Sequence, residues 1–327
     1  MANKFKSPLA EEFESFLQYK RALGYKYKSE ETILHEIDCF IYSQNICETN
    51  LSKDLVMRWS EKKDHQTVKT HLTKVGVIRQ FSIYLNSIGI SAYIYPLELQ
   101  PKSNRKFIPH IYTKEELRKF FTAVDNLDFC KNSAKRHIVY PMLFRLLLGC
   151  GLRLSEALNL KLANVDLDDG ILTILNGKLS KDRIVPLSAD LIKYCKTYYD
   201  TMSLSGDPDD LFFPNRYNET YSIKSIYWSF RKILWMAGIS HQGREKGPRI
   251  HDFRHTFAVY CLKQWVEQGL DVNSMLPVLA NYLGHSDISG TLGYLQLTVD
   301  MYPHITKLIE KDFGNIIPNG GNYYANH

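Results

Sequence analysis

The chain has 327 residues, of which 44% are hydrophobic and 23% charged, so we expect an ordinary globular protein of about two domains. No stretch approaches the ~20 apolar residues of a membrane span, and the opening residues, MANKFKSPLAEEFESFL, lack a signal-peptide pattern. The formal net charge of +6 favours an anionic partner. The six cysteines include no CxxC pair, which excludes a zinc ribbon or a CxxC redox motif. We therefore expect a cytoplasmic protein without a membrane partner.

Apolar residues recur at helical spacing through the first 95 residues and predict four helices and no strand. The expected helices cover residues 9–24, 29–45, about 52–62 and 65–88. Gly24 and Gly89 fit the ends of the first and last of them, because glycine readily adopts the conformation that terminates a helix. The pattern predicts a small all-α bundle, which we assign to a domain of residues 1–100.

Basic residues punctuate this expected bundle. On its last helix we single out Lys69, Lys74 and Arg79 as candidate DNA-binding residues. A solvated helix face is the simpler explanation for any one of them. The alternative is a surface that neutralises phosphate charge along a nucleic-acid backbone.

Prolines bracket the segment LELQPKSNRKFIP, which we interpret as an extended linker over residues 101–109. Lys102, Arg105 and Lys106 make this linker cationic, so they are further candidate DNA-binding residues. A generic interdomain connection fits the composition nearly as well. A second domain is expected over residues 110–315, followed by a flexible tail over residues 316–327.

The second domain opens on a capping box, Thr113 to Glu116, which predicts a helix through about residue 124. The apolar segment HIVYPMLFRLLLGCG predicts a buried helix that ends near Gly149 or Gly151, and RLSEALNL a short helix after it. Alternating residues in GILTIL and DRIVPLS, around a turn at NGK, indicate a hairpin or a small three-stranded sheet. From residue 189 onward the pattern is mostly helical, and it ends with a short amphipathic helix over residues 299–314. The expected fold class is mainly α with a small β-sheet.

Two arginines and a histidine are candidates for binding an anion. Arg153 follows Gly149-Cys150-Gly151-Leu152 and starts a helix, a position that favours an anionic ligand. Glu156 stands one turn later, so a surface ion pair is the alternative for Arg153. His251 and Arg254 are three residues apart, which places both on one face of a helix.

Three further candidates complete a constellation. Lys178 lies in the turn NGKLSKDR, His285 follows an apolar helix after Leu283-Gly284, and Tyr294 stands nine residues after His285. A capping role is the alternative for His285. Most of the 21 tyrosines must serve packing, so Tyr294 gains meaning only from its neighbours. Together with the two arginines and His251, these residues predict a phosphate-binding site with a tyrosine nucleophile.

The order of GLRLSEALNL, a lysine in a β-turn, HDFRHTFA, LGH and a tyrosine nine residues later resembles the tyrosine recombinase (phage integrase) family. The resemblance extends from about residue 9 to about residue 312, and EEFESFLQYKRALGY resembles the family's all-α core-binding (SAM-like) bundle. The implied fold is that bundle followed by an α+β catalytic domain. The family's catalytic residues carry over to Arg153, Lys178, His251, Arg254, His285 and Tyr294.

The hairpin lysine leaves one choice open. The sequence carries Leu179 where relatives often have glycine, so Lys181 is the alternative to Lys178 as the catalytic lysine. Lys181 and Arg183 are otherwise expected to bind DNA.

The resemblance implies site-specific recombination of double-stranded DNA through a covalent 3′-phosphotyrosine. Arg153 and Arg254 would hold the non-bridging phosphate oxygens, His251 would accept the tyrosine proton and Lys178 would protonate the leaving 5′-oxygen. No metal, ATP or other cofactor is expected. The partners implied are double-stranded DNA and three further copies of the chain, in a homotetramer on two DNA sites that falls back to a monomer or weak dimer off DNA. Accessory proteins are also compatible with this picture.

Several interpretations of the biological role are open. We favour a mobile-element integrase that acts in DNA integration or transposition, with an Xer-type chromosome-dimer resolvase as the alternative. A type IB topoisomerase-like enzyme would share the chemistry. A catalytically silent DNA-binding regulator would share the fold without the chemistry. A basic helical scaffold with chance motifs would share neither the fold nor the chemistry.

Overall fold

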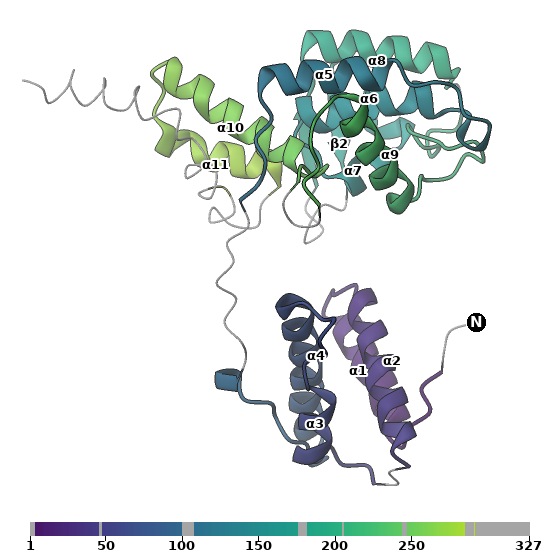
Figure 1. The fold of residues 1–327 in the computed structure, drawn as a ribbon, viewed down its shortest axis with the longest axis vertical. Helices are drawn as coiled ribbons and strands as arrows, with labels where there is room; N and C mark the ends of the chain where they lie inside the picture. The colour runs from purple at the N-terminus through teal and green to yellow at the C-terminus, as the bar shows by residue number, and fades with distance from the viewer. Residues whose placement is uncertain are drawn as a thin grey trace, which may run out of the picture. The chain divides into compact units, whose positions relative to one another are not determined.

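The computed structural model describes residues 4–45, 48–99, 108–175, 182–204, 206–243, 247–284 and residue 291. The chain divides into two compact units, Met1–Phe107 and Ile108–His327, each with its own core. In the described part of the chain both units are mainly helical, and the second also holds a small antiparallel sheet (Figure 1). The predicted fold class is therefore confirmed. The helix expected over residues 299–314 lies outside the described residues, and no described helix is long and apolar enough to cross a membrane.

The first unit is the predicted four-helix arrangement. Its elements are α1 (Ala10–Ala22), α2 (Lys28–Ser43), α3 (Lys53–Trp59), α4 (Val68–Ser87) and the 3-10 turn η1 (Leu97–Leu99). Phe13 of α1 stacks on Phe81 of α4 with ring centroids 4.2 Å apart, at the centre of the core. The buried face of α4 differs in detail from the helical repeat that predicts it, because Val68 is exposed whereas Val77 and Phe81 are buried. That repeat consists of Val68, Leu72, Val75, Ile78, Ser82 and Leu85. The first turn of α4 thus extends beyond the core.

The second unit contains the remaining elements. They are α5 (Lys114–Asp125), η2 (Lys131–Ser133), α6 (Arg136–Gly149), α7 (Leu154–Leu158), η3 (Leu162–Asn164), β1 (Val165–Asp166), β2 (Ile171–Ile174), β3 (Arg183–Pro186), α8 (Ala189–Met202), α9 (Ile223–Met236), α10 (Asp252–Glu267) and α11 (Val272–Leu283). The capping box predicted at Thr113 is present: its Oγ1 accepts from the Glu116 N–H, and Glu116 Oε2 accepts from the Thr113 N–H. The strands form a sheet in the order β1-β2-β3, with Leu172 opposite Val185.

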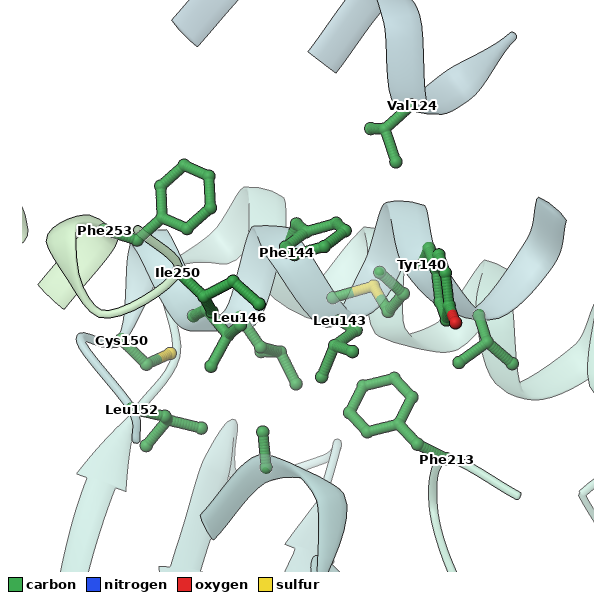
Figure 2. Close-up of a cluster of buried hydrophobic side chains, with 14 of the residues drawn as sticks. Val124, Tyr140, Leu143, Phe144, Leu146, Cys150, Leu152, Phe213, Ile250 and Phe253 are labelled. Atoms are coloured by element: carbon green, nitrogen blue, oxygen red, sulfur yellow. The ribbon is translucent and has the colours of Figure 1, made fainter. Parts of the chain in front are cut away.

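The core of the second unit fixes the start of α10. Phe253 is fully buried and stacks on Tyr112 at 4.8 Å between ring centroids. Figure 2 shows Phe253 with the side chains of α6, and its ring centroid lies 5.9 Å from that of Phe144. Farther along α10, Thr256 Oγ1 accepts from the Tyr112 N–H at 3.0 Å. These contacts hold the first turn of α10 in one place, and that turn carries Arg254.

Candidate active site

A tight turn sets the position of Arg153. Helix α6 ends at Gly149, and Gly151 then adopts a left-handed conformation with φ +59°. A Cβ at Gly151 would lie 2.7 Å from Cδ1 of Phe257 and 3.0 Å from Cδ2 of Leu283, so only glycine fits here. After this turn, Arg153 is the N-terminal cap residue of α7 and has extended backbone angles.

Arg254 lies on the opposite side of this turn and is almost completely buried, with 1% of its surface exposed. Its Nη1 donates to the Gly151 carbonyl at 2.8 Å, and its Nη2 donates to the Leu283 carbonyl. Arg254 therefore ties the turn before Arg153 to the end of α11. The spacing of His251 and Arg254 predicts that both lie on one face of a helix, and in the structure His251 is the N-terminal cap residue of α10 while Arg254 lies in its first turn.

Three arginines donate hydrogen bonds to the carbonyls at the C-terminus of α11. Helix α11 ends at Leu283, and its C-terminal cap residue, Gly284, is left-handed with φ +66°. The carbonyl of Tyr282 accepts from Arg183 Nε at 2.8 Å, that of Leu283 accepts from Arg254, and that of Gly284 accepts from Arg153 Nη2 at 2.9 Å. We call Arg153, Arg183 and Arg254 the arginine cluster. Carbonyls at a helix end have no partner inside the helix and carry the negative end of its dipole, so they suit guanidinium groups.

Glu156 joins two members of the arginine cluster. Its Oε1 accepts from Arg153 Nη1 at 2.6 Å and from Arg183 Nη1 at 3.1 Å, and its Oε2 accepts from Arg183 Nη2 at 2.8 Å. The Arg153 N–H also donates to Oε2 at 2.9 Å. Burial favours a raised pKa for Glu156, but hydrogen bonds from Arg183 and Arg153 and the charge of Arg183 outweigh it and lower the pKa to about 2. The Arg153–Glu156 pair considered from the sequence thus exists, although Glu156 is only 7% exposed and is no surface residue.

His251 is a neutral base beside this cluster. Its surroundings are desolvated, and together with the charges of Arg254 and Arg153 this lowers the pKa of His251 to about 4. The residue as a whole is exposed at the surface, while its ring packs edge-on against His255 with centroids 4.8 Å apart. At neutral pH the imidazole therefore carries no charge and can accept a proton.

The structure brings together Arg153, His251 and Arg254 of the six predicted catalytic residues. Lys178, His285 and Tyr294 lie outside the described residues, as do four of the predicted DNA-binding residues, Lys102, Arg105, Lys106 and Lys181. Tyr282, whose carbonyl accepts from Arg183, is largely buried, and burial raises the pKa of its phenol well above the usual value. That environment favours the protonated phenol and makes Tyr282 a poor nucleophile.

The other predicted DNA-binding residues differ in exposure. Lys69 of α4 is exposed. Lys74 pairs with Glu36 at 3.1 Å and lies over the Trp59 ring at 4.6 Å, and Arg79 donates to the Tyr95 carbonyl at 2.6 Å. The side chains of Lys74 and Arg79 thus make contacts within the first unit.

Arg183 was expected to bind DNA, but its side chain is only 7% exposed and its guanidinium faces Glu156 and α11. The alternation of side chains along β3 accounts for this burial. Residues two apart in a strand share a face, and Val185 is buried while Ile184 is exposed, so Arg183 faces inward with Val185.

Comparisons with known proteins agree with this geometry. The model of the phage integrase family matches residues 111–300. Tyrosine recombinase XerA of Thermococcus onnurineus is 32% identical over 216 residues, covering 65% of this chain and 66% of that protein. Tyrosine recombinase XerD of Oceanobacillus iheyensis is 28% identical over 316 residues, covering 92% and 95%. Among solved structures, the Tn1549 transposon integrase in complex with transposon right end DNA has the same fold, with a TM-score of 0.61 at 13% identity over 92% of this chain and 98% of that one.

The fold and the clustered arginines define a tyrosine recombinase, and the chain belongs to the phage integrase family. The resemblance recognised from the motifs is thereby confirmed. As a member of this family the chain is a site-specific recombinase.

Proposed function

We propose that this recombinase cleaves and rejoins double-stranded DNA with Tyr294 as the nucleophile. The observation that carries the proposal is the convergence of Arg153 and Arg254 on the carbonyls at the end of α11, with His251 close enough for the charges of both arginines to act on it. The next residue along the chain is His285, and Tyr294 follows nine residues later. The predicted nucleophile therefore lies a short stretch of chain away from a fixed cationic site.

The proposed step is an in-line displacement at phosphorus. The Tyr294 oxygen bonds to phosphorus while the bond to the 5′-oxygen breaks, leaving a 3′-phosphotyrosine and a 5′-hydroxyl. His251, which is neutral at neutral pH because its pKa is about 4, accepts the Tyr294 proton as the phosphorus–oxygen bond forms. Lys178 gives a proton to the 5′-oxygen, with Lys181 as the alternative, and His285 hydrogen-bonds the phosphate. Rejoining is the reverse reaction with a new 5′-hydroxyl, so the phosphodiester energy is retained and no ATP is consumed.

Arg153 and Arg254 would stabilise the charge on the non-bridging oxygens. A guanidinium offers five N–H donors in a planar fork, so one group can hold a carbonyl and a phosphate together. The Arg153 side chain is 21% exposed and accessible from solvent. Arg254 is buried, so a phosphate would reach it after a local rearrangement of the surrounding chain.

The proposal extends to partners and setting. Five basic residues would contact the DNA backbone: exposed Lys69, the linker residues Lys102, Arg105 and Lys106, and Lys181. Residues 1–100 would act as a DNA-binding domain joined by the linker to a catalytic domain of residues 110–315. Four copies would assemble on two DNA sites in the cytoplasm, from monomers or weak dimers and with accessory proteins where the system uses them. A mobile-element integrase remains the favoured role, ahead of a chromosome-dimer resolvase.

Covalent trapping tests the nucleophile. A binding site would first be selected from random duplexes, and nicks would be placed at successive positions so that cleavage releases a short fragment. We expect an SDS-resistant adduct with wild type and with Tyr282→Phe, and none with Tyr294→Phe. An adduct that survives in Tyr294→Phe would move the nucleophile elsewhere. Tight binding without any adduct would favour the silent DNA-binding regulator, and relaxation of supercoils without a specific site would favour the topoisomerase-like reading.

A further inference from the structure

Arg183 has no role in the proposed chemistry, yet it is built into the centre of the site. It opens strand β3, directly after the hairpin turn, and its guanidinium meets Glu156 with two parallel hydrogen bonds of 3.1 and 2.8 Å. Its Nε donates to the Tyr282 carbonyl at 2.8 Å. A planar fork bound to a carboxylate on one side and to a carbonyl on the other has one orientation.

The carboxylate that Arg183 holds also orients Arg153. Glu156 Oε1 accepts from both guanidiniums, and Oε2 accepts from Arg183 Nη2 and from the Arg153 N–H. Removing Arg183 would leave Glu156 with one cationic partner. The carboxylate could then rotate toward Arg153 and draw that guanidinium away from its present direction.

Arg183 also supports the other contact of Arg153. Gly284 packs so closely on Arg183 that an added Cβ would lie 3.0 Å from Nη1 and 3.3 Å from Cδ. The carbonyl of the same Gly284 accepts from Arg153 Nη2 at 2.9 Å. In the described part of the chain, two groups hold the Arg153 guanidinium, the Glu156 carboxylate and the Gly284 carbonyl, and both residues contact Arg183.

We propose that Arg183 is a positioning residue for DNA cleavage, which aims the Arg153 guanidinium at the scissile phosphate through Glu156 and Gly284. It acts without touching DNA, since its side chain is almost fully buried. This inference rests on the proposed function, because it assigns Arg183 to the phosphate-binding step of that reaction. Lysine is no substitute, because an ammonium group lacks the fork that grips both Glu156 oxygens and the Tyr282 carbonyl.

The test compares two substrates in single-turnover cleavage. One duplex carries the normal scissile phosphate, and the other a neutral methylphosphonate, which has one non-bridging oxygen and depends less on Arg153. The loss of cleavage rate that Arg153→Ala causes on each substrate serves as the reference. We expect Arg183→Met to cleave the phosphate about 100-fold more slowly than wild type and the methylphosphonate within about threefold of it, since a misplaced group costs on the order of 100-fold where its charge is needed. Arg183→Lys should show the same pattern with a smaller loss.

Arg145→Met is the matched control. Arg145 also forms a two-bond pair with a carboxylate, donating to both oxygens of Asp125 at 2.7 Å, but it lies on α6 outside the arginine cluster. It should lose stability while cleaving the two substrates in the wild-type ratio. An equal loss on both substrates in Arg183→Met and Arg183→Lys, or no loss on either, would overturn the inference. A wild type that fails to cleave the phosphate duplex would instead overturn the proposed function.

Discussion

Replacing Glu156 with glutamine should destabilise the protein in a way that depends on pH. The carboxylate is buried between Arg153 and Arg183, and its pKa falls from 4.5 to about 2. Each tenfold change in acid dissociation is worth about 1.36 kcal/mol, so ionised Glu156 favours the folded state by about 3 kcal/mol at pH 7. Removing one partner of a buried ion pair costs about 3–5 kcal/mol, which agrees with that value.

The pH dependence follows from the sign of the change. A carboxyl with a lowered pKa in the folded protein contributes its full stability above pH 4.5 and loses it as the pH falls toward 2. The gap between wild type and Glu156→Gln should therefore shrink from about 3 kcal/mol at pH 7 to about 1.4 kcal/mol at pH 3. Urea unfolding of both full-length proteins at the two pH values measures it. Asp209→Asn, which removes an exposed pair with Lys161, should change little at either pH. A gap below about 1 kcal/mol at pH 7, or one equal at both pH values, would refute the reasoning.

Three further predictions concern the same unit. In Arg254→Met the pKa of His251 should rise from about 4 toward its ordinary value, because a nearby cation is gone. NMR titration of the histidine ring measures this pKa. An unchanged titration midpoint would contradict the proximity of the two charges. Gly151→Ala should lower the free energy of unfolding by about 2–4 kcal/mol and Gly269→Ala by about 1–2 kcal/mol. Both glycines are left-handed, but only Gly151 is crowded by neighbouring side chains. Equal melting temperatures for the two variants would contradict this. Thr113→Ala should cost about 1 kcal/mol in thermal unfolding through loss of the capping box, and an unchanged melting temperature would argue against that cap.

Local signals made much of the fold predictable. The capping box at Thr113 and the glycines that end α1 and α6 are written in a few adjacent residues, and the helices begin and end close to where those signals stand. Arg153 and Arg254 were found because motif order and spacing are also properties of the sequence. The exposed start of α4 was missed because periodicity identifies a face and not how far the core extends along it.

Contacts between distant residues were not predictable in the same way. Arg183 lies 27 residues from Glu156 and 99 residues from Tyr282, and no repeat or spacing connects them. An arginine beside a turn resembles a surface residue, so the sequence suggested DNA binding. Only the inward side of β3, shared with Val185, indicates burial, and that clue identifies a direction and not a partner.

The charges of the arginine cluster suggest why so many cations are held together. Among these four described side chains, the three arginines carry one positive charge each and Glu156 carries one negative charge, so the group of four has a net charge of +2. The carbonyls at the end of α11 hold the three guanidiniums in place despite their repulsion. A phosphodiester carries one negative charge, whereas the five-coordinate phosphorus of the proposed step carries two. A positively charged group of this kind interacts more strongly with the charge that develops during cleavage than with the charge of the bound DNA, and stabilisation that is greater in the transition state is what accelerates a reaction.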